Sequence, residues 1–145
     1  MRKHFFLIRY QILTSILFLI LVVGFQTISE ESVRIAIPPN RIALTFDDGP
    51  YPASTEKLLQ LLKQENIKAT FFIVGEMAEK YPYLLKLLAS EGQEVANHTF
   101  SHPNLTKLTR NQIIEELEKT RLLIKKYTEK DAYFFRPPGG NYNLE

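Results

Sequence analysis

At 145 residues the chain is long enough for one domain at most. Its net charge is +2, and three of its 18 basic and two of its 16 acidic residues precede position 32, so the rest is nearly neutral and no nucleic-acid-binding face is expected. The absence of cysteine excludes disulfide bonds, so stability must come from a packed core or from a bound metal ion.

Residues 1–31 have the pattern of an export signal. Basic residues Arg2, Lys3 and Arg9 precede an apolar run over 12–25. A buried core helix is the weaker alternative at this extreme N-terminal position. No clear small-x-small cleavage site follows, so we expect an uncleaved signal-anchor in preference to a cleaved signal peptide. In either case the remainder would be extracytoplasmic, held at the membrane by the N-terminal hydrophobic helix or secreted.

Residues 32–40 read as a short polar linker, and residues 41–145 as one α/β domain. After position 40, short apolar segments rich in β-branched and aromatic residues alternate with segments of helical periodicity, which predicts βα units on a parallel sheet. The expected strands are 41–46, 69–74, 93–97 and 131–136, and the expected helices are 54–66, 81–92 and 109–127. Asn66 and Gly92 suit helix ends, and Thr109 with Gln112 forms a capping box at the start of the last helix.

Polar residues that could bind a metal ion or transfer a proton follow three of the four expected strands. Asp47 and Asp48 end the first strand, Asn97 and His98 end the third, and Arg136 ends the fourth. The Asp-Asp-Gly-Pro sequence taken alone would also suit a simple turn. However, the carboxyl ends of parallel strands meet on one rim, where sites are built in sheets and barrels of this kind. We therefore expect these residues to form one site.

His98 and His102 are candidates for metal ligands. On a helix their spacing would put both imidazoles on one face, but Pro103 disfavours a helix at His102, so a tight loop is equally compatible. Two imidazoles and one carboxylate form a three-ligand set that leaves positions open for water and substrate, as catalytic zinc sites do. A non-haem iron oxygenase uses similar ligands but is less favoured, because there the acid usually lies near the first histidine.

One of the two adjacent aspartates would then remain for proton transfer. A carboxylate beside a metal-bound water can act as general base, and an arginine on the same rim can keep it ionised and oriented. Asp48 is the better candidate for the ligand and Asp47 for the base. Spacing alone does not decide between the two assignments.

Three motifs resemble those of the polysaccharide deacetylase family, the carbohydrate esterases with a NodB homology domain. They are TFDDGP at 45–50, HTFSH at 98–102 and RPPGG at 136–140. The resemblance implies a distorted (β/α) barrel, of which about four βα units are present here. It also implies a hydrolase that removes acetyl groups from N-acetylated polysaccharide such as peptidoglycan or chitin, or from O-acetylated xylan. Its cofactor would be a divalent metal, with zinc first and cobalt, nickel or manganese as alternatives.

The resemblance also assigns roles to individual residues. The implied metal ligands are Asp48, His98 and His102. Asp47 would be the base and Arg136 the residue that tethers it. The backbone N–H of Gly139, beside Pro138, would help to bind the oxyanion and substrate; many family members have an aromatic residue where this chain has Gly139, so one aromatic contact is lost.

The later family motifs, including the downstream histidine that serves as general acid, have no counterpart before Glu145. We therefore expect a C-terminally truncated deacetylase domain. The alternative to an active enzyme is an inactive fragment, or a non-catalytic remnant that binds glycan or metal. The polymer and the oligomeric state are left open.

Overall fold

The computed structural model describes residues 40–142, in which three parallel strands form a sheet in chain order. β1 (Thr45–Phe46) pairs with β2 (Thr70–Ile73), and β2 pairs with β3 (Glu94–Asn97). The expected export signal (1–31) and all but the last residue of the expected linker (32–40) lie outside this range. No helix within residues 40–142 combines the length and the apolar character needed to cross a membrane.

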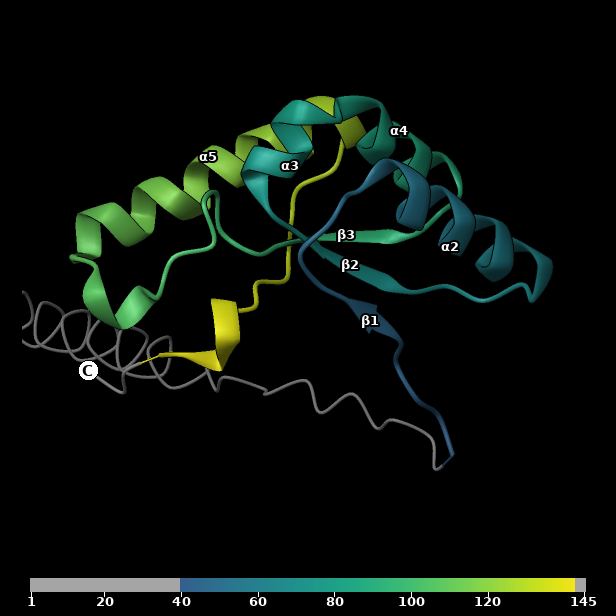
Figure 1. Cartoon of the computed structure of the whole chain (residues 1–145), viewed down its shortest axis with the longest axis horizontal. Coiled ribbons are helices and arrows are strands. Elements are labelled where there is room, and N and C mark those ends of the chain that lie inside the picture. The colour runs from purple at the N-terminus through teal and green to yellow at the C-terminus, as the bar shows by residue number, and fades with distance from the viewer. Residues whose placement is uncertain (1–39, 143–145) are drawn as a thin grey trace, which may run out of the picture. The chain divides into compact units, whose positions relative to one another are not determined.

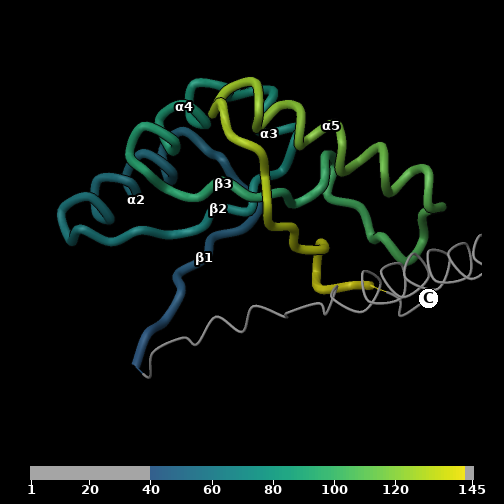
Figure 2. The backbone as a smooth tube through the Cα atoms, turned by 180° about the vertical axis from the view of Figure 1, so that it is seen from behind, coloured from purple at the N-terminus to yellow at the C-terminus, as the bar shows by residue number. Residues whose placement is uncertain are grey.

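Four helices lie on one side of this sheet (Figure 1), and the view from behind in Figure 2 agrees. They are α2 (Pro52–Gln64), α3 (Gly75–Lys80), α4 (Pro82–Ser90) and α5 (Arg110–Thr128), with 3₁₀ turns η1 (Leu105–Lys107) and η2 (Pro138–Gly140). Parallel neighbours require such crossover connections, because a tight hairpin can join only antiparallel strands. The described part is therefore α/β, consistent with part of an α/β barrel.

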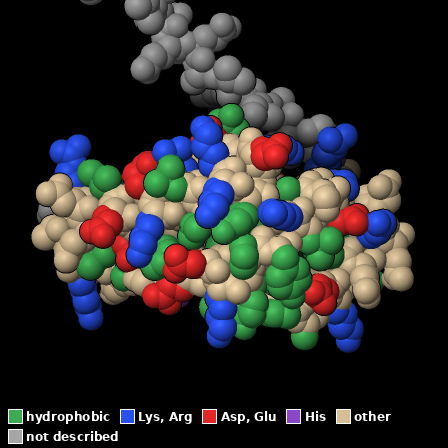
Figure 3. Space-filling model, turned by 90° about the horizontal axis from the view of Figure 1, so that it is seen from above, with side chains coloured by type: hydrophobic (Ala, Val, Ile, Leu, Met, Phe, Trp, Pro, Cys, Tyr) green, Lys and Arg blue, Asp and Glu red, His purple; other side chains and the backbone are tan. Residues whose placement is uncertain are grey.

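The core lies between the helices and the face of the sheet that they cover. Phe71 and Ile73 of β2 point into it and meet leucines of α2 and α4, while Ile124 contributes from α5. Leu85 of α4 is completely buried, and burying such a side chain stabilises the fold by about 1.5–3 kcal/mol. Phe72 lies outside this cluster, as the alternation of side chains along a strand requires. Seen from above, the helices present basic and acidic side chains interspersed with hydrophobic ones, and the basic side chains on this face are spread out (Figure 3).

Several local expectations are confirmed. Thr109 caps α5, and both hydrogen bonds of its capping box with Gln112 are present. Asn66 and Gly92, just past α2 and α4, adopt the left-handed conformation with φ of 53° and 68°. Such turns satisfy the last carbonyl groups of a helix.

Two of the four expected strands differ from the structure. The first is restricted to Thr45–Phe46, because its partner β2 begins at Thr70, opposite Thr45, and Ile42 is left 87% exposed. The expected strand at 131–136 is wrong: this segment passes beside β3 but forms only the isolated bridge between Asn97 and Phe135. Ion pairs draw its first residue to α5, and a proline without an N–H follows its last. Helix α3 was not predicted at all.

Candidate metal centre

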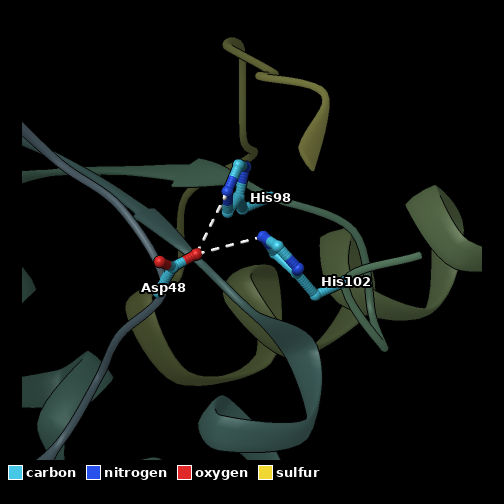
Figure 4. Close-up of side chains that lie close together, drawn as sticks. All are labelled: Asp48, His98 and His102. Carbon is cyan, nitrogen blue, oxygen red and sulfur yellow. Dashed lines mark ion pairs between the residues drawn. The ribbon is translucent and has the colours of Figure 1, made fainter. Parts of the chain in front are cut away.

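Three of the candidate residues meet at the carboxyl end of the sheet. Asp48 follows β1, His98 follows β3, and His102 lies on the loop after it; their side chains point toward one another in Figure 4. One ligand atom from each lies within 4.8 Å of the others. The loop alternative for His102 is the correct one, since residues 98–102 contain no helix.

The spacing of the ligand atoms fits a divalent cation. Asp48 Oδ1 lies 3.4 Å from His98 Nε2 and 3.1 Å from His102 Nε2. Metal–ligand bonds of about 2.1 Å place neighbouring ligand atoms about 3.4 Å apart in a tetrahedral site and about 3.0 Å apart in an octahedral one. The distances are thus compatible with either geometry and do not select a metal.

The hydrogen bond of His98 determines which of its ring nitrogens can act as a ligand. His98 is buried, and its Nδ1 lies 2.8 Å from the backbone carbonyl oxygen of Arg136. A carbonyl can only accept, so Nδ1 carries the proton and Nε2 of the neutral ring has a free lone pair. That lone pair faces a carboxylate oxygen. Two electron-rich atoms that face each other are stabilised by a proton or a metal ion between them, so the arrangement is compatible with a bound cation.

Asp47 is held apart from this group by the side chain of Arg136. Arg136 Nη1 donates to Asp47 Oδ1 at 2.7 Å and to Thr45 Oγ1 at 3.1 Å. Its guanidinium also lies 4.1 Å from the ring centroid of Phe72, a cation–π contact. The two adjacent aspartates therefore have different surroundings, one paired with arginine and the other facing two imidazoles.

The backbone around the site is strained. Asp48, Thr99 and His102 have φ values of 71°, 68° and 57°, in the left-handed region. Each such non-glycine residue costs of order 1–3 kcal/mol, and a β-branched threonine is rarely found there. Contacts elsewhere in the fold must offset this cost. The left-handed conformations turn adjacent side chains in directions that a regular strand or helix would not allow.

The segment proposed for oxyanion binding follows Arg136 directly. Pro138 is buried and Gly139 is exposed within η2. Gly139 has a φ of 61°, and a Cβ there would lie 2.8 Å from Asn141 Nδ2. Glycine thus suits this conformation, while the structure by itself gives Pro138 and Gly139 no ligand.

Sequence reasoning missed two residues that support the site. Thr45 lies two positions before Asp47, so the two-residue repeat of a strand could have placed both side chains on one face. Glu116 of α5 accepts hydrogen bonds from the loop that carries His102. No signal in the sequence indicates that contact, because the two segments approach each other only in the folded chain.

Comparison with known proteins adds three findings. Residues 35–145 match the family described as polysaccharide deacetylase. The chain is 42% identical over 118 residues to a peptidoglycan-N-acetylglucosamine deacetylase of Bacillus cereus, covering 80% of this chain and 43% of the relative. It is 37% identical over 100 residues to a chitooligosaccharide deacetylase of Sinorhizobium fredii, covering 68% and 46%.

Solved structures of deacetylases are also similar to this chain. The peptidoglycan deacetylase PdaC of Bacillus subtilis superposes with a TM-score of 0.70 at 41% identity, covering 74% of this chain and 55% of that one. The chain thus spans about half the length of these relatives.

Proposed function

Since the chain belongs to the polysaccharide deacetylase family, we propose that it serves the metal-dependent removal of acetyl groups from N-acetylated polysaccharide. The observation that carries the proposal is the meeting of Asp48, His98 and His102 beside an aspartate held by arginine. Peptidoglycan is the first candidate substrate, because relatives more than 40% identical are named for it. A chitin-like polymer is the second, supported by the chitooligosaccharide relative.

Asp48, His98 and His102 would hold the metal, and two imidazole nitrogens with one carboxylate oxygen suit zinc first. Cobalt, nickel or manganese would accept the same donors. A bound divalent ion would acidify a coordinated water and polarise the acetyl carbonyl. His98 is prepared for this role, because its bond to the Arg136 carbonyl leaves Nε2 free.

Asp47 would take the proton from the attacking water. Its contact with Arg136 supports this role, since the hydrogen bond from the guanidinium limits the rotation of the carboxylate. Asp48 is less suited to be the base, because its Oδ1 faces both imidazoles. The backbone N–H of Gly139, after Pro138, is the proposed donor to the oxyanion.

Departure of the amine requires a proton from a general acid. The chain has three histidines; two are the proposed ligands, and His4 lies outside the described residues. Residues 40–142 therefore supply no histidine for this step. A non-catalytic, metal-binding or glycan-binding role of this chain on its own is the second candidate function, and this observation favours it.

The proposed location is extracytoplasmic, with the chain anchored by its N-terminal hydrophobic segment or secreted. The basic residues before the apolar run support this orientation, and it would place the site on the side of the membrane where peptidoglycan lies. A reporter fused after Glu145 that is active only in the cytoplasm would exclude it.

Zinc binding by the purified chain tests the metal centre that the proposal requires. We expect about one zinc ion per chain, and His98→Ala should weaken binding by more than tenfold because a direct ligand is lost. His4→Ala is the matched control, since it removes the one histidine not assigned to the site. Equal binding by wild type and His98→Ala would contradict the assignment.

A further inference from the structure

One carboxylate of α5 accepts three hydrogen bonds from the loop that carries His102. Glu116 Oε2 accepts from the backbone N–H groups of Phe100 and Ser101, each at 2.8 Å, and Oε1 accepts from Ser101 Oγ at 2.8 Å. Hydrogen bonds to an ionised acceptor are about twice as strong as neutral ones. Glu116 is thus the acceptor for three donors of one short loop.

This loop needs an external constraint. Thr99 and His102 are both in the left-handed region, so without compensating contacts the backbone between them would relax toward ordinary conformations. A change of φ at His102 would turn its imidazole away from Asp48. The His102 side chain is 43% exposed, so burial alone does not hold it.

The other contacts of this loop with α3 and α5 involve its first residues, Thr99 and Phe100. The N–H groups of Gly75 and Glu76, at the start of α3, donate to the carbonyl oxygens of Thr99 and Phe100. Lys119 of α5 lies 3.7 Å from the ring centroid of Phe100. Within residues 40–142, the hydrogen bonds donated by Ser101, the neighbour of His102, both end on Glu116.

We infer that Glu116 is a positioning residue for the metal centre. By holding Phe100 and Ser101, it keeps the strained loop in the conformation that brings His102 Nε2 to 3.1 Å from Asp48. This inference rests on the proposed function, because it assumes that the Asp48, His98 and His102 group binds metal. Outer residues that orient metal ligands typically contribute 10- to 100-fold in metal affinity.

Zinc titration of the full chain against a chromophoric chelator tests the inference. Glu116→Ala should weaken zinc binding by about 10- to 100-fold. Glu116→Gln should largely restore it, because the amide oxygen can still accept from two N–H groups and the amide nitrogen can donate to Ser101 Oγ. Glu115→Ala is the control, since it removes the same charge from an exposed neighbour on the same helix.

The possible outcomes distinguish failure of this inference from failure of the proposed function on which it rests. No zinc binding by the wild type would overturn both. Wild-type affinity in folded Glu116→Ala would overturn the inference alone, as would equal losses in Glu116→Ala and Glu116→Gln, which would indicate an effect of charge rather than of loop geometry. If Glu116→Ala does not fold, Ser101→Ala removes only the side-chain bond; a several-fold loss of affinity supports the inference, and no loss contradicts it.

Discussion

Arg136 contacts both the proposed base, Asp47, and a proposed metal ligand, His98, through two different chemical groups. Its guanidinium pairs with Asp47, and its backbone carbonyl accepts from His98 Nδ1. The side chain therefore serves the proposed base, and the main chain serves a proposed ligand. Substitution of the side chain should affect the first contact and leave the second intact.

We predict that Arg136→Ala lowers the free energy of unfolding by about 1–2 kcal/mol, since it removes a charge-assisted hydrogen bond and a cation–π contact. Zinc affinity should change little, because the carbonyl that orients His98 remains. Urea unfolding and zinc titration measure the two effects. Arg110→Ala, at the exposed first position of α5, is the control. A large loss of zinc affinity in Arg136→Ala would contradict this division of roles.

Among the elements, α3 and α5 hold the loop after β3 from two sides. The first residue of α3 is glycine because the loop approaches it closely: a Cβ on Gly75 would lie 2.5 Å from Thr120 Oγ1 and 2.9 Å from Phe100 Cα. Real Cβ atoms are not found at such distances from a backbone atom. The site thus depends on the packing of two helices that contribute no proposed ligand.

We predict that Gly75→Ala destabilises the fold by about 1–3 kcal/mol, the usual cost of overpacking, and also weakens zinc binding, because Phe100 belongs to the loop of His102. Thermal unfolding and zinc titration are the measurements. Gly140→Ala is the comparison: its φ of 68° is unfavourable for alanine, but no atom lies within 4 Å of the added Cβ. If Gly75→Ala matched the wild type in both measurements, the close approach would be of no consequence.

The C-terminal end of α5 supports a prediction about pH. Hydrogen bonds from Lys125 and Arg121 lower the pKa of Asp131 below its ordinary value of 3.8. A lowered pKa in the folded state means that the stabilisation is complete above the ordinary pKa and is lost as the pH falls through the folded value. The stability difference between wild type and Asp131→Asn should therefore shrink below about pH 4.

The two ion pairs of Asp131 are exposed to solvent, so the difference in stability between wild type and Asp131→Asn should also decrease at high salt. Urea unfolding of both proteins across this pH range and at two salt concentrations measures it. A difference that grew with acidity would contradict the lowered pKa.

For the whole molecule, the assembled site provides for part of the proposed reaction. The described residues include the proposed metal ligands, the proposed base and the proposed oxyanion donor, and both of their histidines are among the proposed ligands. The chain also spans about half the length of its relatives. If the proposed roles hold, the described residues leave no histidine free to act as general acid, so the proposed reaction needs a proton donor other than His98 and His102.

We predict that the 145-residue chain releases acetate from chitooligosaccharides or peptidoglycan very slowly, because a missing general acid typically costs about 10²- to 10⁴-fold in rate. Extension with the C-terminal segment of the Bacillus cereus relative should raise the rate. Asp47→Asn should then abolish acetate release while zinc binding persists. Rapid turnover by the unextended chain would show that another group, in this chain or a second one, supplies the proton.

The sequence determined the features that depend on local chemistry. Helices α2, α4 and α5 follow from apolar periodicity and capping residues, which act over a few positions along the chain. Convergence of the aspartates and histidines could also be predicted, because parallel strands end on one rim. Family motifs suggested the ligand set, although adjacent aspartates are indistinguishable by spacing.

Tertiary structure alone decided the features that depend on distant contacts. The hydrogen bond that sets the tautomer of His98 and the three hydrogen bonds that Glu116 accepts from the loop of His102 join segments far apart in sequence, and neither was predicted. The failed strand at 131–136 has the same cause: its residues suit a strand, but ion pairs to α5 and a lack of continuous partners on β3 prevail over local preference. In this segment the intrinsic preference of the residues for a strand contributes less to the free energy of folding than the tertiary contacts that compete with it.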